Sequence, residues 1–220
     1  MPATVHLIDD DASFLRSMAR RLSGRGYQVA TYPTVAEFLE RPDPDSPGCV
    51  LADLQMPQQD GFALQEQLAV SEHPLPVVFV TGKGDIPTSV RAMRGGAEDF
   101  LTKRVQTPEL IDAIERAIAR DRRDRQTRRL RVEARRRVEE LTGRELQALL
   151  GIVKGLSNRE MAEAYEMSER TVKYYRTMLT RRLDIYTSVD LARLVQDAGI
   201  SIEELAALAA TAPPGPQHEG

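Results

Sequence analysis

A chain of 220 residues with 41% hydrophobic residues, 29% charged residues and a net charge of −3 has the composition of a soluble globular protein and enough material for two modest cores. Its one cysteine, Cys49, excludes an internal disulfide and fits a reducing compartment. Neither a signal peptide nor an apolar stretch of roughly 20 residues is present, so we expect a cytoplasmic protein without a membrane span.

The first half of the chain alternates short apolar runs with longer amphipathic stretches. The apolar runs, which predict strands, are residues 5–8, 28–32, 49–54, 77–80 and 99–101. The amphipathic stretches, which predict helices, lie near residues 12–24, 34–40, 60–70, 86–95 and 107–120. Five strands alternating with five helices predict an α/β fold, a doubly wound five-stranded parallel sheet with right-handed crossovers.

Polar residues stand where four of these strands end. The first strand is followed by Asp9, Asp10 and Asp11, the third by Asp53, and the fourth by Thr81. Lys103 follows the fifth strand. Ligands of open parallel sheets bind just outside the carboxyl ends of the strands, so we expect these side chains to converge in one crevice.

Such a crevice suits phosphoryl transfer to a carboxylate. Carboxylates held close together favour either a proton or a hard divalent cation, and Mg²⁺ prefers one or two carboxylates together with phosphate oxygens. Asp53 would be the nucleophile, with Lys103 and Thr81 facing the phosphoryl oxygens. The alternative is that each acidic residue is only a helix cap or a solvated loop group. This alternative requires all of these polar residues to follow the correct strands by coincidence.

Four segments in this half resemble the receiver domains of two-component response regulators. They are VHLIDDD, VLADLQMPQQDG, VVFVTGKGD and GAEDFLTK, and the resemblance covers residue 4 to about 120. It implies a flavodoxin-like receiver whose phosphoacceptor is Asp53. It also implies that Asp9, Asp10, Asp53 and the backbone carbonyl of Gln55 hold Mg²⁺.

The resemblance implies further roles around the phosphoryl group. Thr81 and Lys103 would hold its oxygens, and Phe100 would turn inward when Thr81 moves, although core packing alone also explains Phe100. The family usually has proline after the lysine, whereas this chain has Arg104. A cis bond before a non-proline residue costs ~3 kcal/mol, so the loop after Lys103 either carries that strain or follows another path.

An arginine-rich segment separates the two halves of the chain. Residues 119–138 contain 10 arginines against 3 acidic residues. Opposite charges recur four residues apart, in the pairs Asp121 with Arg125, Asp124 with Arg128, and Glu133 with Arg137. This pattern predicts that the helix beginning near residue 107 continues as a solvated helical linker over 121–138, between a domain at 1–120 and a domain at 139–200. Contact of the arginines with DNA phosphates is the alternative.

The second half of the chain is predicted to be all helical. Helices are expected near residues 142–154, 158–164, 168–183 and 187–198. Thr142 with Glu145 and Ser157 with Glu160 form capping boxes at two of the helix starts. The short second helix and the tight turn before the third match a helix-turn-helix, and the third helix has a basic face.

The segment LTGRELQALLGIVKGLSNREMAEAYEMSERTVKYYRTMLTRRLDI resembles the LuxR-type helix-turn-helix, and the two halves together resemble the FixJ/NarL class of response regulators. The resemblance implies a DNA-binding transcription regulator that a sensor histidine kinase phosphorylates and that forms a homodimer when phosphorylated. The residues expected to contact double-stranded DNA, at base edges or phosphates, are Ser157, Asn158, Ser168, Arg170, Thr171, Lys173, Tyr174, Arg176 and Thr177.

The end of the chain offers two more expectations. Leu191, Leu194 and Val195 on the helix at 187–198 either pair with a second copy of the chain or pack in the core. Beyond Gly199, residues 201–210 predict a short helix, and the proline-containing tail at 211–220 predicts disorder.

Two other functions compete with a transcription regulator. A metal-dependent phosphatase that forms an aspartyl phosphate would need a second acid two residues after the nucleophile, where this chain has Gln55. A receiver that acts only through protein contacts would use the helical half as an interaction module instead of a DNA-binding domain.

Overall fold

The computed structural model describes residues 3–41, 46–56 and 60–213. It divides into two compact units, residues 1–125 and 126–220, and the division falls inside the arginine-rich segment. Helix α5 (Thr107–Glu139) contributes residues to both units, which confirms the prediction that the helix beginning near residue 107 continues through this segment. Within the described part of the chain, every helix is too short or too polar to cross a membrane.

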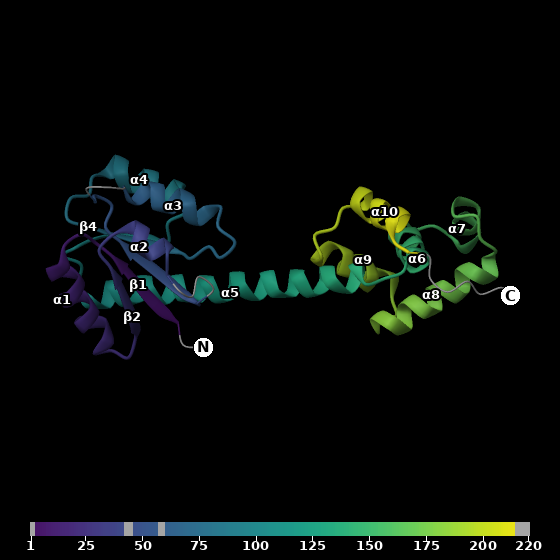
Figure 1. The fold of residues 1–220 in the computed structure, drawn as a ribbon, viewed down its shortest axis with the longest axis horizontal. Helices are drawn as coiled ribbons and strands as arrows, with labels where there is room; N and C mark the ends of the chain where they lie inside the picture. Colours follow the sequence, from purple (N-terminus) through teal and green to yellow (C-terminus); the bar gives the residue numbers. More distant parts are fainter. Residues whose placement is uncertain (1–2, 42–45, 57–59, 214–220) are drawn as a thin grey trace. The chain divides into compact units, whose positions relative to one another are not determined.

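The first unit is a parallel α/β sheet, as predicted (Figure 1). Its strands are β1 (Thr4–Ile8), β2 (Gln28–Tyr32), β3 (Gly48–Ala52), β4 (Val77–Thr81) and β5 (Asp99–Thr102), in the spatial order β2-β1-β3-β4-β5. Its helices are α1 (Ala12–Ser23), α2 (Val35–Leu39), α3 (Gly61–Ala69), α4 (Ile86–Arg94) and the first part of α5. All four strand pairs are parallel, which confirms the predicted fold class.

The central strands β1, β3 and β4 are buried on both faces because they are apolar at successive positions. Val5 and Leu7 of β1 belong to one core cluster with residues of α1 and α5, whereas Ile8 belongs to another with residues of α2, α3 and α4. Side chains of a strand point alternately to opposite faces, so a continuous apolar run supplies both clusters. The sheet therefore separates α1 and α5 from α2, α3 and α4.

One charge pair that the sequence places on a solvated helix is buried instead. The side chain of Asp121 is 0% exposed and that of Arg125 is 8% exposed, and Arg125 Nε lies 2.9 Å from Asp121 Oδ1. Asp121 also accepts a hydrogen bond from the Gly48 N–H, and Arg125 donates to the Ser46 carbonyl, both at 2.9 Å. The expectation of a solvated pair was wrong here, because α5 runs along the start of β3.

The other two expected charge pairs are replaced by different partners. Asp124 pairs with Arg120 at 3.7 Å, and Glu133 pairs with Arg136 at 3.0 Å. These side chains are about half exposed, so the pairs contribute little to stability.

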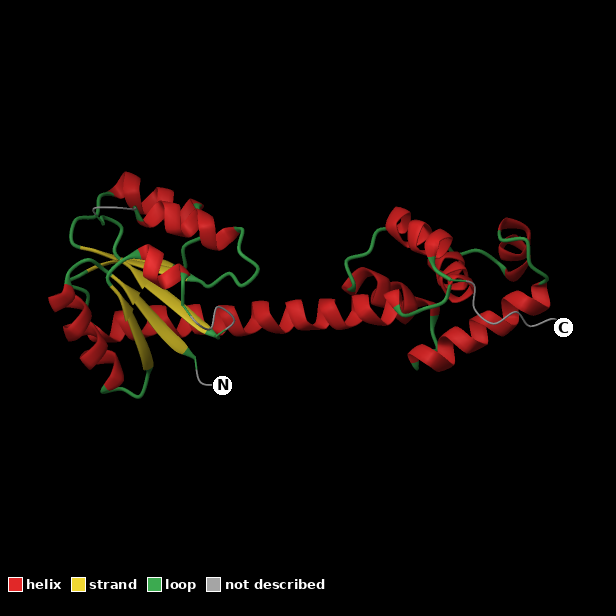
Figure 2. Cartoon of the chain, viewed as in Figure 1, coloured by secondary structure: helices red, strands yellow, loops and turns green. Residues whose placement is uncertain are grey.

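The second unit is all helical (Figure 2). Beyond α5, its helices are α6 (Gly143–Val153), α7 (Asn158–Ala164), α8 (Glu169–Leu183), α9 (Ser188–Asp197) and α10 (Ile202–Thr211). Thr142 and Ser157 form the two predicted capping boxes, and Ser168 caps α8. The core of this unit also includes Ala134 and Val138 from the end of α5.

The structure decides between the two expectations for α9. Leu191, Leu194 and Val195 are 1%, 6% and 4% exposed and belong to the core of the second unit. They are therefore packing residues, and their side chains do not form a free face. The helix predicted at 201–210 is α10. The tail expected to be disordered began at Thr211, which is instead the last residue of α10, and residues 214–220 lie outside the described residues.

Candidate functional site

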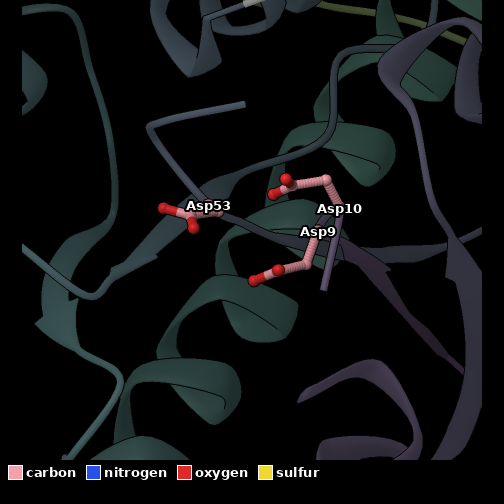
Figure 3. Close-up of side chains that lie close together, drawn as sticks. All are labelled: Asp9, Asp10 and Asp53. Carbon is pink, nitrogen blue, oxygen red and sulfur yellow. The ribbon is translucent and has the colours of Figure 1, made fainter. Parts of the chain in front are cut away.

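The register of β1 and β3 brings two carboxylates side by side. Ile8 is paired with Ala52, so Asp9 and Asp53 are the next residues on neighbouring strands, and the Asp53 N–H donates to the Ile8 carbonyl at 2.9 Å. Asp9, Asp10 and Asp53 each have a carboxylate oxygen within 4.8 Å of the others (Figure 3). Asp9 and Asp53 are buried and Asp10 is exposed, so the cluster opens towards solvent on one side.

Lys103 supplies the charge that this cluster lacks. Its Nζ lies 2.6 Å from Asp9 Oδ2 and 2.8 Å from Asp53 Oδ2. The same ammonium lies 4.5 Å from the centre of the Phe14 ring, a cation–π contact. Burial lowers the pKa of Lys103, but the hydrogen bonds to Asp53 and Asp9 outweigh burial and hold the pKa above its ordinary value. Lys103 is therefore protonated at neutral pH.

The pKa values of Asp9 and Asp11 are shifted in opposite directions. Burial raises the pKa of Asp9 above its ordinary value by more than the hydrogen bond from Lys103 lowers it. Asp11 instead caps α1, where its Oδ1 accepts hydrogen bonds from the backbone N–H groups of Phe14 and Ser13, and these bonds lower its pKa. Of the three aspartates after β1, only Asp9 and Asp10 belong to the carboxylate cluster.

The cluster fits the chemistry of Mg²⁺. It offers three carboxylates from two strand ends, at least one of them accessible to water, and all ligand atoms are oxygen. The Gln55 N–H donates to Asp53 Oδ1 at 3.2 Å, which holds the backbone of Gln55 beside the acceptor. The sequence expectation for Gln55 concerns its backbone carbonyl, and its side chain is exposed.

Thr81 and Phe100 lie on the next two strands of the sheet. Thr81 is 1% exposed, and its Oγ1 donates to the Lys83 carbonyl at 3.3 Å. Phe100 is half-buried and packs against the core cluster of α2, α3 and α4. A Cβ added at Gly84 would lie 2.6 Å from the Phe100 ring, so the β4–α4 loop passes directly over it. The side chain of Lys83 is exposed.

The loop after Lys103 follows an all-trans path in spite of Arg104. No cis peptide bond occurs in the described ranges, which include residues 103 and 104. The Lys103 N–H donates to the Thr81 carbonyl at 2.8 Å, and the Val105 N–H donates to the Thr102 carbonyl at 2.9 Å, which closes a turn. Lys103 thus reaches the carboxylates without a cis peptide bond before Arg104.

Arg21 is a residue near the site that the sequence pattern did not reveal. From the last turn of α1, its guanidinium donates to Thr107 Oγ1 at 2.6 and 3.1 Å and to the Val105 carbonyl at 3.3 Å. These bonds join residues more than 80 positions apart, so neither periodicity nor local spacing could have predicted them.

The residues expected to contact DNA lie mainly on α8. Arg170, Lys173 and Thr177 are exposed, whereas Thr171 and Arg176 are half-buried. Tyr174 is also half-buried, packs against the core and meets the Tyr175 ring edge to face at 5.3 Å between centroids. Three of these side chains are thus freely accessible on one helix, with two positive charges among them.

The helix starts at α7 and α8 are partly occupied by their own caps. Ser157 Oγ accepts from the Glu160 N–H, and Glu160 in turn accepts from the Ser157 N–H at 2.7 Å. Ser168 Oγ accepts from the Thr171 N–H at 3.1 Å. Asn158 is half-buried at the first position of α7. The hydroxyls of Ser157 and Ser168 therefore serve first as caps, and DNA contact would be an additional role.

Two arginines, Arg182 and Arg137, make further contacts that hold α8 in place and that the sequence pattern did not reveal. Arg182 lies 2.9 Å from Glu145 Oε2 and donates to the Glu140 carbonyl at 2.6 Å. Glu145 is the buried carboxylate of the α6 capping box, so α8 is tied to the start of α6. Arg137 of α5 donates to the Leu183 carbonyl at the end of α8.

Two protein families match separate parts of the chain. The family described as "Response regulator receiver domain" matches residues 5–115, and the family described as "Bacterial regulatory proteins, luxR family" matches residues 139–195. The first match covers β1 to the early turns of α5, and the second covers α6, α7, α8 and most of α9. The carboxylate cluster thus lies in the part of the chain that matches the receiver family, and the basic helix α8 lies in the part that matches the luxR family.

Several relatives are similar along nearly the whole chain. Nodulation protein W of Bradyrhizobium diazoefficiens is 35% identical, over 90% of this chain and 88% of that protein. Transcriptional regulatory protein FixJ of the same organism is 33% identical, over 89% of this chain and 96% of that protein. The solved structure of the response regulator StyR is 36% identical with a TM-score of 0.77, covering 89% of this chain and 99% of that one.

Proposed function

Because this chain belongs to the two-component response regulators that join a receiver domain to a LuxR-type DNA-binding domain, we propose that phosphorylation of Asp53 controls its binding to DNA. The observation that carries this assignment is the position of Lys103 Nζ, 2.6 Å from Asp9 and 2.8 Å from Asp53 at the carboxyl ends of β1 and β3. A carboxylate beside a fixed ammonium and a cluster of acids is a suitable phosphoryl acceptor.

Each residue has a distinct task in this proposal. Asp53 attacks the phosphorus of a phosphohistidine on a partner kinase, the P–N bond breaks as the new P–O bond forms, and the departing imidazole takes up a proton. Lys103 then neutralises a phosphoryl oxygen, and the Thr81 hydroxyl donates to another. Asp9, Asp10, Asp53 and the Gln55 carbonyl would hold Mg²⁺, which supplies charge neutralisation at the phosphoryl oxygens. Phe100 follows the movement of Thr81.

The second half of the proposal concerns DNA. The exposed residues Arg170, Lys173 and Thr177 of α8 would enter the major groove, and Arg176 would contact the phosphate backbone. A homodimer of the phosphorylated protein would place two such helices on a two-fold site. Because its kinase delivers the phosphoryl group to a protein that acts on the chromosome, we assign the protein to the cytoplasm.

A turnover enzyme is the less favoured candidate. A phosphatase that works through an aspartyl phosphate needs an acid two residues after the nucleophile, to protonate the leaving group. This chain has Gln55 there, and an amide cannot donate a proton in that role. We therefore infer that the protein accepts a phosphoryl group on its own Asp53 and loses it only by self-dephosphorylation.

Direct phosphorylation tests the assignment of Asp53. The wild-type protein and Asp53→Asn are incubated with a small phosphodonor and Mg²⁺, and the phosphorylated fraction is measured by intact-mass spectrometry. We expect one phosphoryl group on the wild type and none on the variant. Phosphorylation of both proteins to the same extent would assign the acceptor to another residue.

A further inference from the structure

The loop between β5 and α5 carries Lys103 but has few backbone bonds of its own. The Lys103 N–H donates to the Thr81 carbonyl on the neighbouring strand. Within the loop itself, the main hydrogen bond runs from the Val105 N–H to the Thr102 carbonyl and closes a turn. The side chain of Val105 is buried in the core cluster of α1 and α5. The exposed Arg104 lies between Lys103 and this anchor.

Helix α1 holds this loop from outside at two points. Arg21 donates to the Val105 carbonyl and, through both Nε and Nη2, to Thr107 Oγ1. About two turns nearer the start of α1, the centre of the Phe14 ring lies 4.5 Å from the Lys103 ammonium. The guanidinium is a rigid fork, so it fixes two acceptors relative to each other as well as to α1.

We propose that Arg21 is a positioning residue for phosphoryl transfer, which acts by fastening the β5–α5 loop so that Lys103 stays over Asp9 and Asp53. The proposal rests on the assignment of Asp53 as acceptor. Arg21 touches neither the carboxylates nor the phosphoryl group, and its effect passes through Val105 and Thr107. Misplacing a group that neutralises charge in a transfer reaction slows the reaction even when all reacting residues remain.

The matched comparison is between two adjacent arginines. Arg20 and Arg21 both lie in the last turn of α1. They carry the same charge, and both interact favourably with the helix dipole. Arg20 is exposed, whereas Arg21 is half-buried against the loop. We expect Arg21→Ala to be phosphorylated about tenfold more slowly by a small phosphodonor with Mg²⁺, whereas Arg20→Ala keeps the wild-type rate.

The acceptor side of the contact gives a second test. Thr107→Val removes the hydroxyl and keeps the shape of the side chain. If Arg21 acts through Thr107, the double variant is no slower than Arg21→Ala alone, because the two changes break one contact. Arg21→Lys, which keeps one donor group, should recover part of the rate. Additive effects of Arg21→Ala and Thr107→Val would contradict the proposal.

Affinity for Mg²⁺ separates positioning from a general loss of structure. Lys103 competes with a cation for Asp9 and Asp53, so a loosened Lys103 leaves Mg²⁺ affinity unchanged or higher. A damaged fold would lower it. Because the chain contains no tryptophan whose fluorescence could report Mg²⁺ binding, titration calorimetry with Mg²⁺ alone is the suitable measurement.

These measurements separate failure of this inference from failure of the proposed function. If the wild type gains no phosphoryl group on Asp53, the proposed function fails. If the wild type is phosphorylated and Arg21→Ala matches Arg20→Ala, the role of Arg21 is refuted. A slower Arg21→Ala with weaker Mg²⁺ binding and a lower melting temperature would also refute it, because Arg21 would then support only the fold.

Discussion

At the scale of single residues, the site is organised around one positive charge among three acids. Lys103 lies within 2.8 Å of two of them, and without it Asp9 and Asp53 would repel each other in a region shielded from water. Any cation or phosphoryl group that enters must share these carboxylates with Lys103. The resting site is therefore already arranged for the charge that phosphorylation introduces.

The raised pKa of Asp9 gives a prediction for metal binding and pH. Because burial raises this pKa, folding favours the protonated acid, and ionisation of Asp9 costs stability as the pH rises through that pKa. Bound Mg²⁺ requires the ionised form and offsets the cost. At about ten times its Kd, Mg²⁺ should raise the free energy of unfolding by about 1.4 kcal/mol at neutral pH.

The stabilisation by Mg²⁺ should become smaller as the pH falls towards the titration range of Asp9, because protons then compete with the metal for the carboxylate. Chemical unfolding with and without Mg²⁺ at a series of pH values measures it. The control is Asp9→Asn, for which the Mg²⁺ effect should be smaller and should change less as the pH is lowered, because only Asp10 and Asp53 then remain as carboxylate ligands. A wild-type effect of constant size down to acidic pH would show that Asp9 does not bind the metal.

At the scale of elements, the middle of α5 is bound to the start of β3 by the buried pair of Asp121 and Arg125. The Asp121 carboxylate has no exposed surface and bonds both to Arg125 and to the Gly48 N–H. Gly48 has no room for a side chain, because an added Cβ would lie 1.9 Å from the Thr4 carbonyl oxygen. The backbone of Gly48 can therefore lie close to that of Thr4, while its N–H donates to Asp121.

Removing one partner of this pair should be costly. In Arg125→Ala the buried Asp121 loses its counter-charge, and we expect the free energy of unfolding of the first unit to fall by about 3 kcal/mol. Urea unfolding followed by circular dichroism measures the change. Arg123→Ala, which removes an exposed arginine from the same helix, is the control and should change stability by less than about 0.5 kcal/mol. Equal effects of both variants would mean that the pair is not buried in solution.

Helix α8 gives a prediction that distinguishes base contacts from phosphate contacts. On a DNA site selected from random sequences, Lys173→Ala should cost about 1–3 kcal/mol of binding and relax the sequence preference at one position. Arg176→Ala should weaken binding to all sequences. It should also reduce the slope of log affinity against log salt concentration by about one. Fluorescence anisotropy over a range of salt concentrations measures both.

Arg159→Ala is the control for this series, because Arg159 is 80% exposed on α7 and pairs with Glu163. It should leave affinity and salt dependence unchanged. Equal losses for Lys173→Ala and Arg159→Ala would remove α8 from the DNA interface.

At the scale of the whole molecule, the sequence was sufficient for features that depend on local pattern. The five strands were predictable because apolar runs of strand length alternate with amphipathic stretches, and the capping boxes at Thr142 and Ser157 were visible as short motifs. The convergence of Asp9, Asp53 and Lys103 followed from one topological rule about strand ends.

Features that depend on distant contacts could not be predicted in this way. The spacing of Asp121 and Arg125 was visible, but their burial depends on Gly48, more than 70 positions away. The bond from Arg21 to Thr107 has no local signal at all. Leu191 and Leu194 of α9 fit both a dimer face and a core by pattern, and only the packing of the second unit identifies them as core.

The measurement that tests the central claim most directly is DNA binding by the wild type and by Asp53→Asn, each with and without a small phosphodonor and Mg²⁺. Phosphorylation of Asp53 should change the affinity of the wild type for its DNA site, and the phosphodonor should have no effect on Asp53→Asn. Identical binding by both proteins under every condition would contradict the account, because the carboxylate cluster would then have no influence on the DNA-binding unit.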